Sequence, residues 1–206
     1  KLEFDEKQIK ELVEYSESIQ IKFFASVWDL DSVKLMSKYT KIAKIPSALI
    51  TDLELCKAAR EAFDFLIIST GMSTQEEINN CIEACSPYVI MHTNSTYPCP
   101  SEDLNLNYIK YLQEKFGNNS SIGYSGHEFG LVTTYASVAL GPSWGERHIT
   151  MDRNSWGSDQ SSSIEPDDLI KLVKGIRSIE KAMMYPPQER ICFEKENEKK
   201  DSLRKK

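Results

Sequence analysis

Short apolar runs alternate along this chain with longer segments in which apolar residues recur every three or four positions. The apolar runs have the length and the flanking residues of buried strands. They are nearly continuous rather than alternating, so we expect each strand to be covered on both faces. Six such strands are predicted, at residues 21–27, 41–47, 65–70, 88–93, 121–125 and 145–150.

The segments before, between and after these runs have the periodicity of amphipathic helices. One is expected within residues 1–15, and Ser73 with Glu76 three positions on has the capping-box pattern of a helix start. Further helices are predicted at 29–39, 51–63, 73–85, 101–116, 129–141 and 165–183. The last of them carries an apolar face formed by Leu169, Leu172, Val173, Ile176 and Ile179.

Strands that alternate with helices indicate an α/β protein with a parallel sheet, either a (β/α)₈ TIM-type barrel or a doubly wound sheet. Polar residues follow successive strands, from Ser26 to Thr150. A barrel builds its site from many strand ends at one rim, whereas a doubly wound sheet uses one switch point, so the barrel is favoured. About six βα units are present. We expect an N-terminally incomplete barrel domain at 1–185, with the first two strands before residue 1. We also expect a charged tail at 186–206, either a frayed or disordered end or a stub that leads to a further segment.

Composition narrows the class of protein further. The chain has 206 residues, a net charge of -6 and a pI near 5.2, which do not favour binding to nucleic acid or to an anionic membrane. No apolar run approaches the roughly 20 residues that span a bilayer. The cysteines are odd in number and lack paired zinc spacing, which predicts reduced thiols in a cytoplasmic protein. They are Cys56, Cys81, Cys85, Cys99 and Cys192.

Two histidines stand at the ends of neighbouring predicted strands. His127 follows the strand at 121–125, and His148 lies within the strand at 145–150. Two imidazoles at adjacent strand ends can share one divalent cation that takes its other ligands from water. The alternative is that both are satisfied polar residues of the core.

Glu146 and His148 alternate along one strand, so both point to the same side. A carboxylate there could orient water or a substrate hydroxyl, or serve as an acid or base. Alternatively, Glu146 pairs with Arg147 or with another cation. Asp159, in a polar loop after the last strand, could hold sugar hydroxyls or could be a turn residue.

Hydroxyl side chains recur at the predicted strand ends. With Lys44 they would form a cradle for a phosphorylated anion, because hydroxyls donate to phosphate oxygens and lysine supplies charge. Lys44 could instead be a solvated lysine, and Tyr97 lies beside the same rim. The hydroxyl residues are Ser26, Ser47, Ser69, Thr70, Thr93, Ser95 and Ser125.

A series of motifs then appears in a fixed order: "KIPS", "STGM", "HTNSTYPCPSEDLNL", "GYSGHEFG", "VALG", "ERHITMD", "GSD" and "SSIEPDDL". On these motifs the chain resembles the sialic acid synthase family, from about residue 20 to residue 183. The resemblance implies a (β/α)₈ barrel. It also implies an enzyme that condenses phosphoenolpyruvate with N-acetylmannosamine or a related amino sugar, giving a nonulosonic acid and phosphate.

The resemblance also implies roles for individual residues. His127 and His148 would bind a divalent cation, Mn²⁺ or Mg²⁺. Independently of the resemblance, we expect Gly126 to allow a tight turn between Ser125 and His127. Sugar contacts would come from Tyr97, Glu146 and Asp159, with Glu146 also catalytic. Phosphoenolpyruvate would be bound by Ser26, Lys44, Ser47, Ser69, Ser95 and Ser125.

Relatives of this kind form homodimers in which a C-terminal antifreeze-like domain supplies an arginine to the partner's site. Neither that domain nor the first two strands has a counterpart here. Gln160 stands where relatives commonly have histidine, and Ser95 where some have asparagine. Two alternative functions follow: a non-catalytic barrel that binds a ligand or partner, and another divalent-metal barrel lyase or aldolase.

Overall fold

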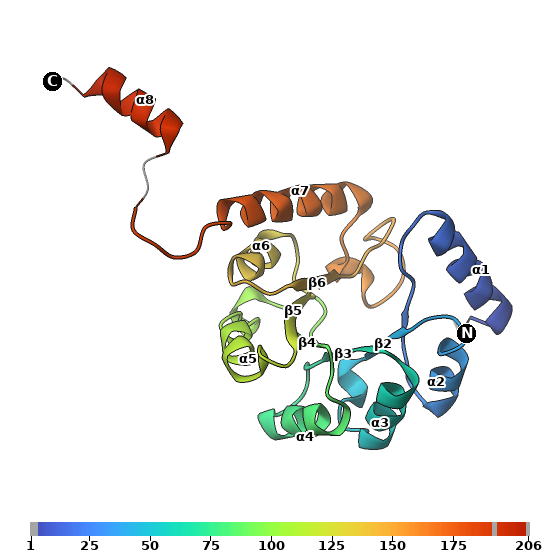
Figure 1. The fold of residues 1–206 in the computed structure, drawn as a ribbon. Coiled ribbons are helices and arrows are strands. Elements are labelled where there is room, and N and C mark those ends of the chain that lie inside the picture. Colours follow the sequence, from blue (N-terminus) through green and yellow to red (C-terminus); the bar gives the residue numbers. More distant parts are fainter. Residues whose placement is uncertain (1–3, 191–192, 205–206) are drawn as a thin grey trace.

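Six parallel strands form one curved sheet in the computed structural model, which describes residues 4–190 and 193–204. Each strand pairs with the next in chain order, so the order never reverses as it would in a doubly wound sheet. The sheet curls into a half-barrel (Figure 1). The predicted barrel-type α/β fold is therefore confirmed. The strands are β1 (Ala25–Ser26), β2 (Ile42–Ile45), β3 (Phe65–Ser69), β4 (Val89–Thr93), β5 (Ser121–Gly126) and β6 (Trp144–Arg147).

Helices cover the outer, convex face of this sheet (Figure 1). Because strand residues alternate between faces, Leu66 and Ile68 of β3 are buried in the main core, with the side chains of the helices. Ile67 belongs instead to a smaller cluster with Val89 and Met91. The helices are α1 (Glu6–Ser18), α2 (Leu30–Met36), α3 (Leu53–Ala62), α4 (Gln75–Cys85), α5 (Tyr108–Phe116), α6 (Val132–Ala139), α7 (Pro166–Ala182) and α8 (Glu194–Leu203).

Several predicted elements are shorter in the structure than the sequence indicated, most of all the strand expected at 21–27, of which only β1 (Ala25–Ser26) is paired as a strand. The helix expected at 101–116 is broken into a 3₁₀ turn at Ser101–Asp103 and α5, because Asn105 takes a left-handed conformation with φ of 44°. The strand expected at 145–150 ends at Arg147, so His148 follows the strand rather than lying within it.

The start of α4 lies one residue later than predicted. Thr74 is the N-cap: its Oγ1 accepts a hydrogen bond from the Glu77 amide, and the Glu77 carboxylate accepts one from the Thr74 amide at 2.7 Å. The predicted pair of Ser73 and Glu76 is therefore wrong by one position. Ser73 Oγ donates instead to the Gly71 carbonyl, which leaves it in the loop.

The charged tail expected at 186–206 contains a helix. Residues 194–203 form α8, which Figure 1 shows standing apart from the half-barrel. This segment is rich in lysine and glutamate, which are good helix formers even without a buried face. On α7, Leu172 of the predicted apolar face is buried, while Leu169 and Val173 are exposed.

The structure also bears on the expected state of the cysteines and on membrane-spanning helices. The cysteines of the described part of the chain, Cys56, Cys81, Cys85 and Cys99, all carry free thiols, and Cys192 lies outside the described residues. Among the helices of that part, none combines the length and the apolar character that crossing a bilayer requires.

The position of the α4 cap can be tested by stability. Thr74→Ala removes the hydroxyl that caps the helix and should lower the free energy of unfolding by about 1 kcal/mol. Ser73→Ala is the matched control, since its hydroxyl contacts only a loop carbonyl, and should change it by less than about 0.5 kcal/mol. Urea-induced unfolding measures both, and an equal loss in the two variants would contradict the assignment of Thr74 as the cap.

Candidate active site

A cavity of about 440 Å³ opens at the carboxyl ends of the strands. Ser26, Lys44 and Ser69 reach it from β1, β2 and β3, while Ser125 and Glu146 reach it from β5 and β6. Of the predicted site residues, Thr70 does not line this cavity: its hydroxyl donates to the Met91 carbonyl at 3.0 Å. The others all lie on its wall, namely Ser26, Lys44, Ser47, Ser69, Thr93, Ser95, Tyr97, Ser125, His127, Glu146, His148 and Asp159.

Strand register explains why residues so far apart in sequence meet here. Ser26 is paired with Lys44 across β1 and β2, and Ser125 is paired with Glu146 across β5 and β6. Registered neighbours in a parallel sheet point to the same face, so these side chains all project into the cavity.

Lys44 and Glu146 form an ion pair across the cavity. The Lys44 ammonium lies 2.5 Å from Glu146 Oε1, and the Ser125 hydroxyl donates to the same oxygen at 2.8 Å. Burial acts to raise the pKa of Glu146, but the charge and hydrogen bond of Lys44 and the hydrogen bond of Ser125 outweigh it and leave that pKa lowered. Glu146 is therefore an ionised carboxylate at neutral pH, suited to accepting a proton or a hydroxyl hydrogen bond.

His127 is held in one orientation by its backbone surroundings. Its Nδ1 lies 2.6 Å from the carbonyl oxygen of Asn94, which can only accept, so Nδ1 carries the proton. Nε2 is then left with a lone pair and accepts from the Tyr97 hydroxyl at 3.1 Å. Burial lowers the pKa of His127, which favours the neutral imidazole. A neutral ring with one nitrogen fixed by a carbonyl is the usual state of a metal-binding histidine.

His148 stands beside His127, with the ring centroids 5.0 Å apart. Asp159 Oδ2 lies 3.5 Å from His148 Nδ1, and the Tyr97 ring packs against both imidazoles. Within residues 4–190 and 193–204, no group of three or more His, Cys, Asp and Glu is arranged to hold a metal ion. A divalent cation would fit here with two imidazole ligands, and water or substrate oxygens would complete its coordination.

Ser47, Ser69 and Ser95 bring hydroxyl groups to the cavity wall at or just after the ends of β2, β3 and β4. Gly71 lies among them: its amide donates to Ser47 Oγ at 3.1 Å, and a Cβ at this position would lie 2.2 Å from Ser95 Oγ. Ser69 Oγ is buried and has no hydrogen-bond partner. Buried hydroxyls are normally paired, so Ser69 is free to bind a ligand oxygen.

Glu128 and Arg147 were not predicted as site residues. They are next in sequence to His127 and His148, but neither side chain lines the cavity. Their side chains are only 1% and 3% exposed and form an ion pair at 3.2 Å. Of the partners considered for Glu146, Arg147 is therefore excluded, because consecutive strand residues point to opposite faces, and the cation that pairs with Glu146 is Lys44. The sequence feature that could have indicated Glu128 and Arg147 as site residues was their position next to His127 and His148.

Gly126 has a different role from the tight turn that was expected. It lies within β5 and does not have a positive φ. A Cβ at Gly126 would lie 2.6 Å from Glu128 Oε2, so the glycine makes room for the buried carboxylate.

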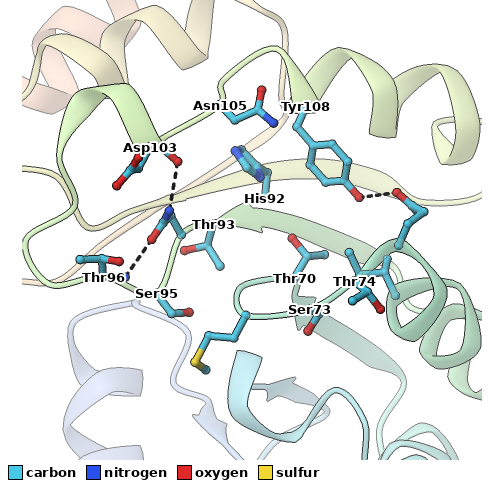
Figure 2. A pocket seen from close by; sticks show the side chains of 14 residues that line it. Thr70, Ser73, Thr74, His92, Thr93, Ser95, Thr96, Asp103, Asn105 and Tyr108 are labelled. Atoms are coloured by element: carbon cyan, nitrogen blue, oxygen red, sulfur yellow. Dashed lines mark hydrogen bonds between the residues drawn. The ribbon is translucent and has the colours of Figure 1, made fainter.

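A second cavity of about 640 Å³ adjoins the first between the loops after β3 and β4 (Figure 2). Thr93, Ser95 and Met72 line both cavities. The ring of His92, the third histidine, points into it, and its Nε2 donates to the Leu104 carbonyl at 2.8 Å. His92 therefore belongs to a separate set of contacts from His127 and His148.

The fold and the cavity together define a half-barrel of the TIM-barrel class with a polar site at its carboxyl rim. The chain belongs to the NeuB family, whose family model matches residues 1–186.

Curated relatives agree with this assignment. The N,N'-diacetyllegionaminic acid synthase of Campylobacter jejuni is 36% identical over 191 residues, which cover 89% of this chain and 57% of the relative. The N-acetylneuraminate-9-phosphate synthase of Homo sapiens is 34% identical over 204 residues, which cover 94% and 56%. The chain thus spans little more than half the length of these relatives.

Solved structures give the same result for the fold. The N-acetylneuraminic acid (sialic acid) synthetase of Leptospira borgpetersenii serovar Hardjo-bovis, determined in complex with citrate, aligns with a TM-score of 0.88 and 32% identity. The alignment covers 99% of this chain and 73% of that one. A truncated 3-deoxy-D-arabino-heptulosonate 7-phosphate synthase from Thermotoga maritima, at 15% identity and a TM-score of 0.75, shares the fold alone.

The close fit around Gly71 can be tested by adding one methyl group. Gly71→Ala should lower the free energy of unfolding by about 1–3 kcal/mol, because its Cβ collides with the hydroxyls of Ser95 and Ser47. Gly145→Ala on β6 is the matched control, since a Cβ there meets nothing within 4 Å. Urea-induced unfolding compares the two, and equal stability of the two variants would show that the hydroxyls have room to move.

Proposed function

We propose that this protein takes part in the condensation of phosphoenolpyruvate with N-acetylmannosamine or a related amino sugar, giving a nonulosonic acid and phosphate. The observation that supports this function best is that the predicted anion, metal and sugar residues all line one cavity. Membership of the NeuB family and similarity to sugar-acid synthases support the same reaction class.

The proposed phosphoenolpyruvate site is the hydroxyl side of the cavity. Ser69 Oγ has no other partner and can donate to an anion oxygen, and the Lys44 ammonium supplies positive charge. The remaining proposed contacts come from Ser26, Ser47, Ser95 and Ser125.

Lys44 and Glu146 change partners in this proposal. Without substrate, the two charges neutralise each other across the cavity. A phosphate or carboxylate group bound near Lys44 draws the ammonium away and leaves the Glu146 carboxylate available to a sugar hydroxyl or to water. Tyr97 and Asp159 line the adjoining wall and are the other proposed sugar contacts.

His127 and His148 are the proposed ligands of Mn²⁺ or Mg²⁺. The bound cation would act as a Lewis acid that polarises the aldehyde of the open-chain sugar. The protein supplies the lone pair of His127 Nε2, fixed by the Asn94 carbonyl, at the cavity wall.

The proposed reaction forms one carbon–carbon bond and, at carbon 2 of phosphoenolpyruvate, replaces the carbon–oxygen bond to phosphate with one to water. Carbon 3 of phosphoenolpyruvate attacks the aldehyde carbon, whose oxygen takes a proton and becomes a hydroxyl. Water adds at carbon 2, and phosphate leaves with the enol oxygen. Glu146 is the proposed acceptor of the proton that this water releases, which its position on the cavity wall supports.

The proposal extends to the setting in which the protein works. The free thiols of the described cysteines fit a reducing, cytoplasmic compartment. A homodimer is proposed from the resemblance to the sialic acid synthase family.

Phosphate release tests the reaction directly. With phosphoenolpyruvate, Mn²⁺ and N-acetylmannosamine, the protein should release phosphate at a rate that depends on the sugar, and Lys44→Met should lower kcat/KM at least about a hundredfold. The readout is a phosphate assay with and without sugar. Sugar-independent hydrolysis, or binding of phosphoenolpyruvate without turnover, would contradict the condensation and favour a non-catalytic binding barrel.

Metal binding tests the histidine pair separately. His127→Ala and His148→Ala should each weaken Mn²⁺ binding at least about tenfold, because each removes one of two protein ligands. His92→Gln is the matched control, since this histidine faces the second cavity. Mn²⁺ is titrated by electron paramagnetic resonance, and unchanged affinity in both alanine variants would rule out the two-histidine site.

A further inference from the structure

The paired part of β5 and β6 stops just short of the two histidines. The last registered pair of these strands is Gly126 with Arg147, so His127 and His148 each lie one residue beyond the ladder. Backbone pairing of the two strands therefore does not by itself set the distance between the imidazoles.

Beyond the ladder, the two histidines are anchored to different segments. The carbonyl of His127 accepts from the Cys99 amide at 2.9 Å, in the loop after β4. The carbonyl of His148 accepts from the Ile164 amide at 2.8 Å, in the loop before α7. Some other contact must hold these two segments at a constant separation.

The Arg147 guanidinium makes that connection. Its Nη2 donates to the carbonyl of Glu128 at 2.8 Å and to that of Ser162 at 3.3 Å, and its Nη1 donates to that of Gly130 at 2.7 Å. Glu128 and Gly130 follow His127, whereas Ser162 lies in the loop that holds His148. One planar side chain thus spans both histidine-bearing segments.

The Glu128 carboxylate keeps that guanidinium in place. It accepts hydrogen bonds from Tyr124 at 2.9 Å, from Thr134 at 2.5 Å and from Arg147 at 3.2 Å. Both charges are almost fully buried, and a buried ion pair is weak evidence for stabilisation because desolvation offsets the attraction. The role of the pair is better sought in the geometry that it imposes.

We propose that the Glu128–Arg147 pair, with Thr134, is a positioning device that sets the separation of His127 and His148 and hence the affinity for a divalent cation. Neither Glu128 nor Arg147 lines the cavity, so both act through the histidines. This inference rests on the proposed metal site.

The main test removes the pair while keeping the side-chain volume. The double variant Glu128→Leu/Arg147→Met replaces both charges with apolar groups, a change that buried ion pairs can tolerate without unfolding. Mn²⁺ titrated by electron paramagnetic resonance should bind about tenfold to a hundredfold more weakly, as when residues that orient metal ligands are lost. The single variant Arg147→Lys should also bind Mn²⁺ more weakly than the parent. It keeps the positive charge but loses the planar guanidinium that donates to both segments.

A milder pair of variants keeps the test valid if the double variant does not fold. Thr134→Val removes the hydroxyl that donates to Glu128 and accepts from Arg147 at 2.8 Å. Ser137→Ala, on the same helix and equally buried, contacts only the Thr134 carbonyl and is the control. Thr134→Val should weaken Mn²⁺ binding several-fold, and Ser137→Ala should leave it unchanged.

The results of Mn²⁺ titration distinguish a failure of the positioning role from a failure of the metal site. If the parent binds Mn²⁺ and the folded Glu128, Arg147 and Thr134 variants bind it equally well, the positioning role is overturned and the metal site stands. If the parent binds no Mn²⁺, the metal site fails and the positioning role with it. In these variants a positioning role further predicts that the KM for phosphoenolpyruvate is unchanged, while the Mn²⁺ concentration needed for activity is raised. General destabilisation would not affect the two quantities differently.

Discussion

Alternation along parallel strands is the constraint on which the whole structure depends. Each strand residue points either to the helix-covered core or to the inner side of the curved sheet. In β6 this rule places Glu146 in the cavity and sends Arg147 behind it, and His148 returns to the cavity just after the strand ends. The same rule places Ser69 at the site beside the core residue Ile68. Site and core are therefore built from alternate residues of the same strands.

Charge in the site is balanced in pairs. Lys44 and Glu146 neutralise each other in the cavity, and Arg147 and Glu128 do so behind it. The first pair is partly open to solvent, so a bound anion can replace one partner. The second pair is sealed by Tyr124 and Thr134, so its geometry stays constant. One pair is thus suited to exchange partners during binding and the other to hold the framework.

Most of the strands and helices could be predicted from the sequence. Six apolar runs separated by amphipathic segments predicted the strands, because burial on both faces requires nearly continuous apolar residues. The predicted helix boundaries were less accurate where a single residue determines them. At Asn105 a left-handed backbone conformation breaks the expected helix. The helix start at Thr74 was missed by one residue, because neighbouring Ser and Thr residues both satisfy the capping pattern.

The sequence by itself determined the fold class, the family and most of the polar residues that line the cavity, because periodicity and ordered motifs are local properties of the chain. Tertiary structure alone decided the orientations: which nitrogen of His127 faces the cavity, which carboxylate pairs with Arg147, and why Gly126 has no side chain. Each of these depends on a contact between segments distant in sequence. The Asn94 carbonyl, for example, lies 33 residues before His127 and sets its protonation only once β4 and β5 are side by side.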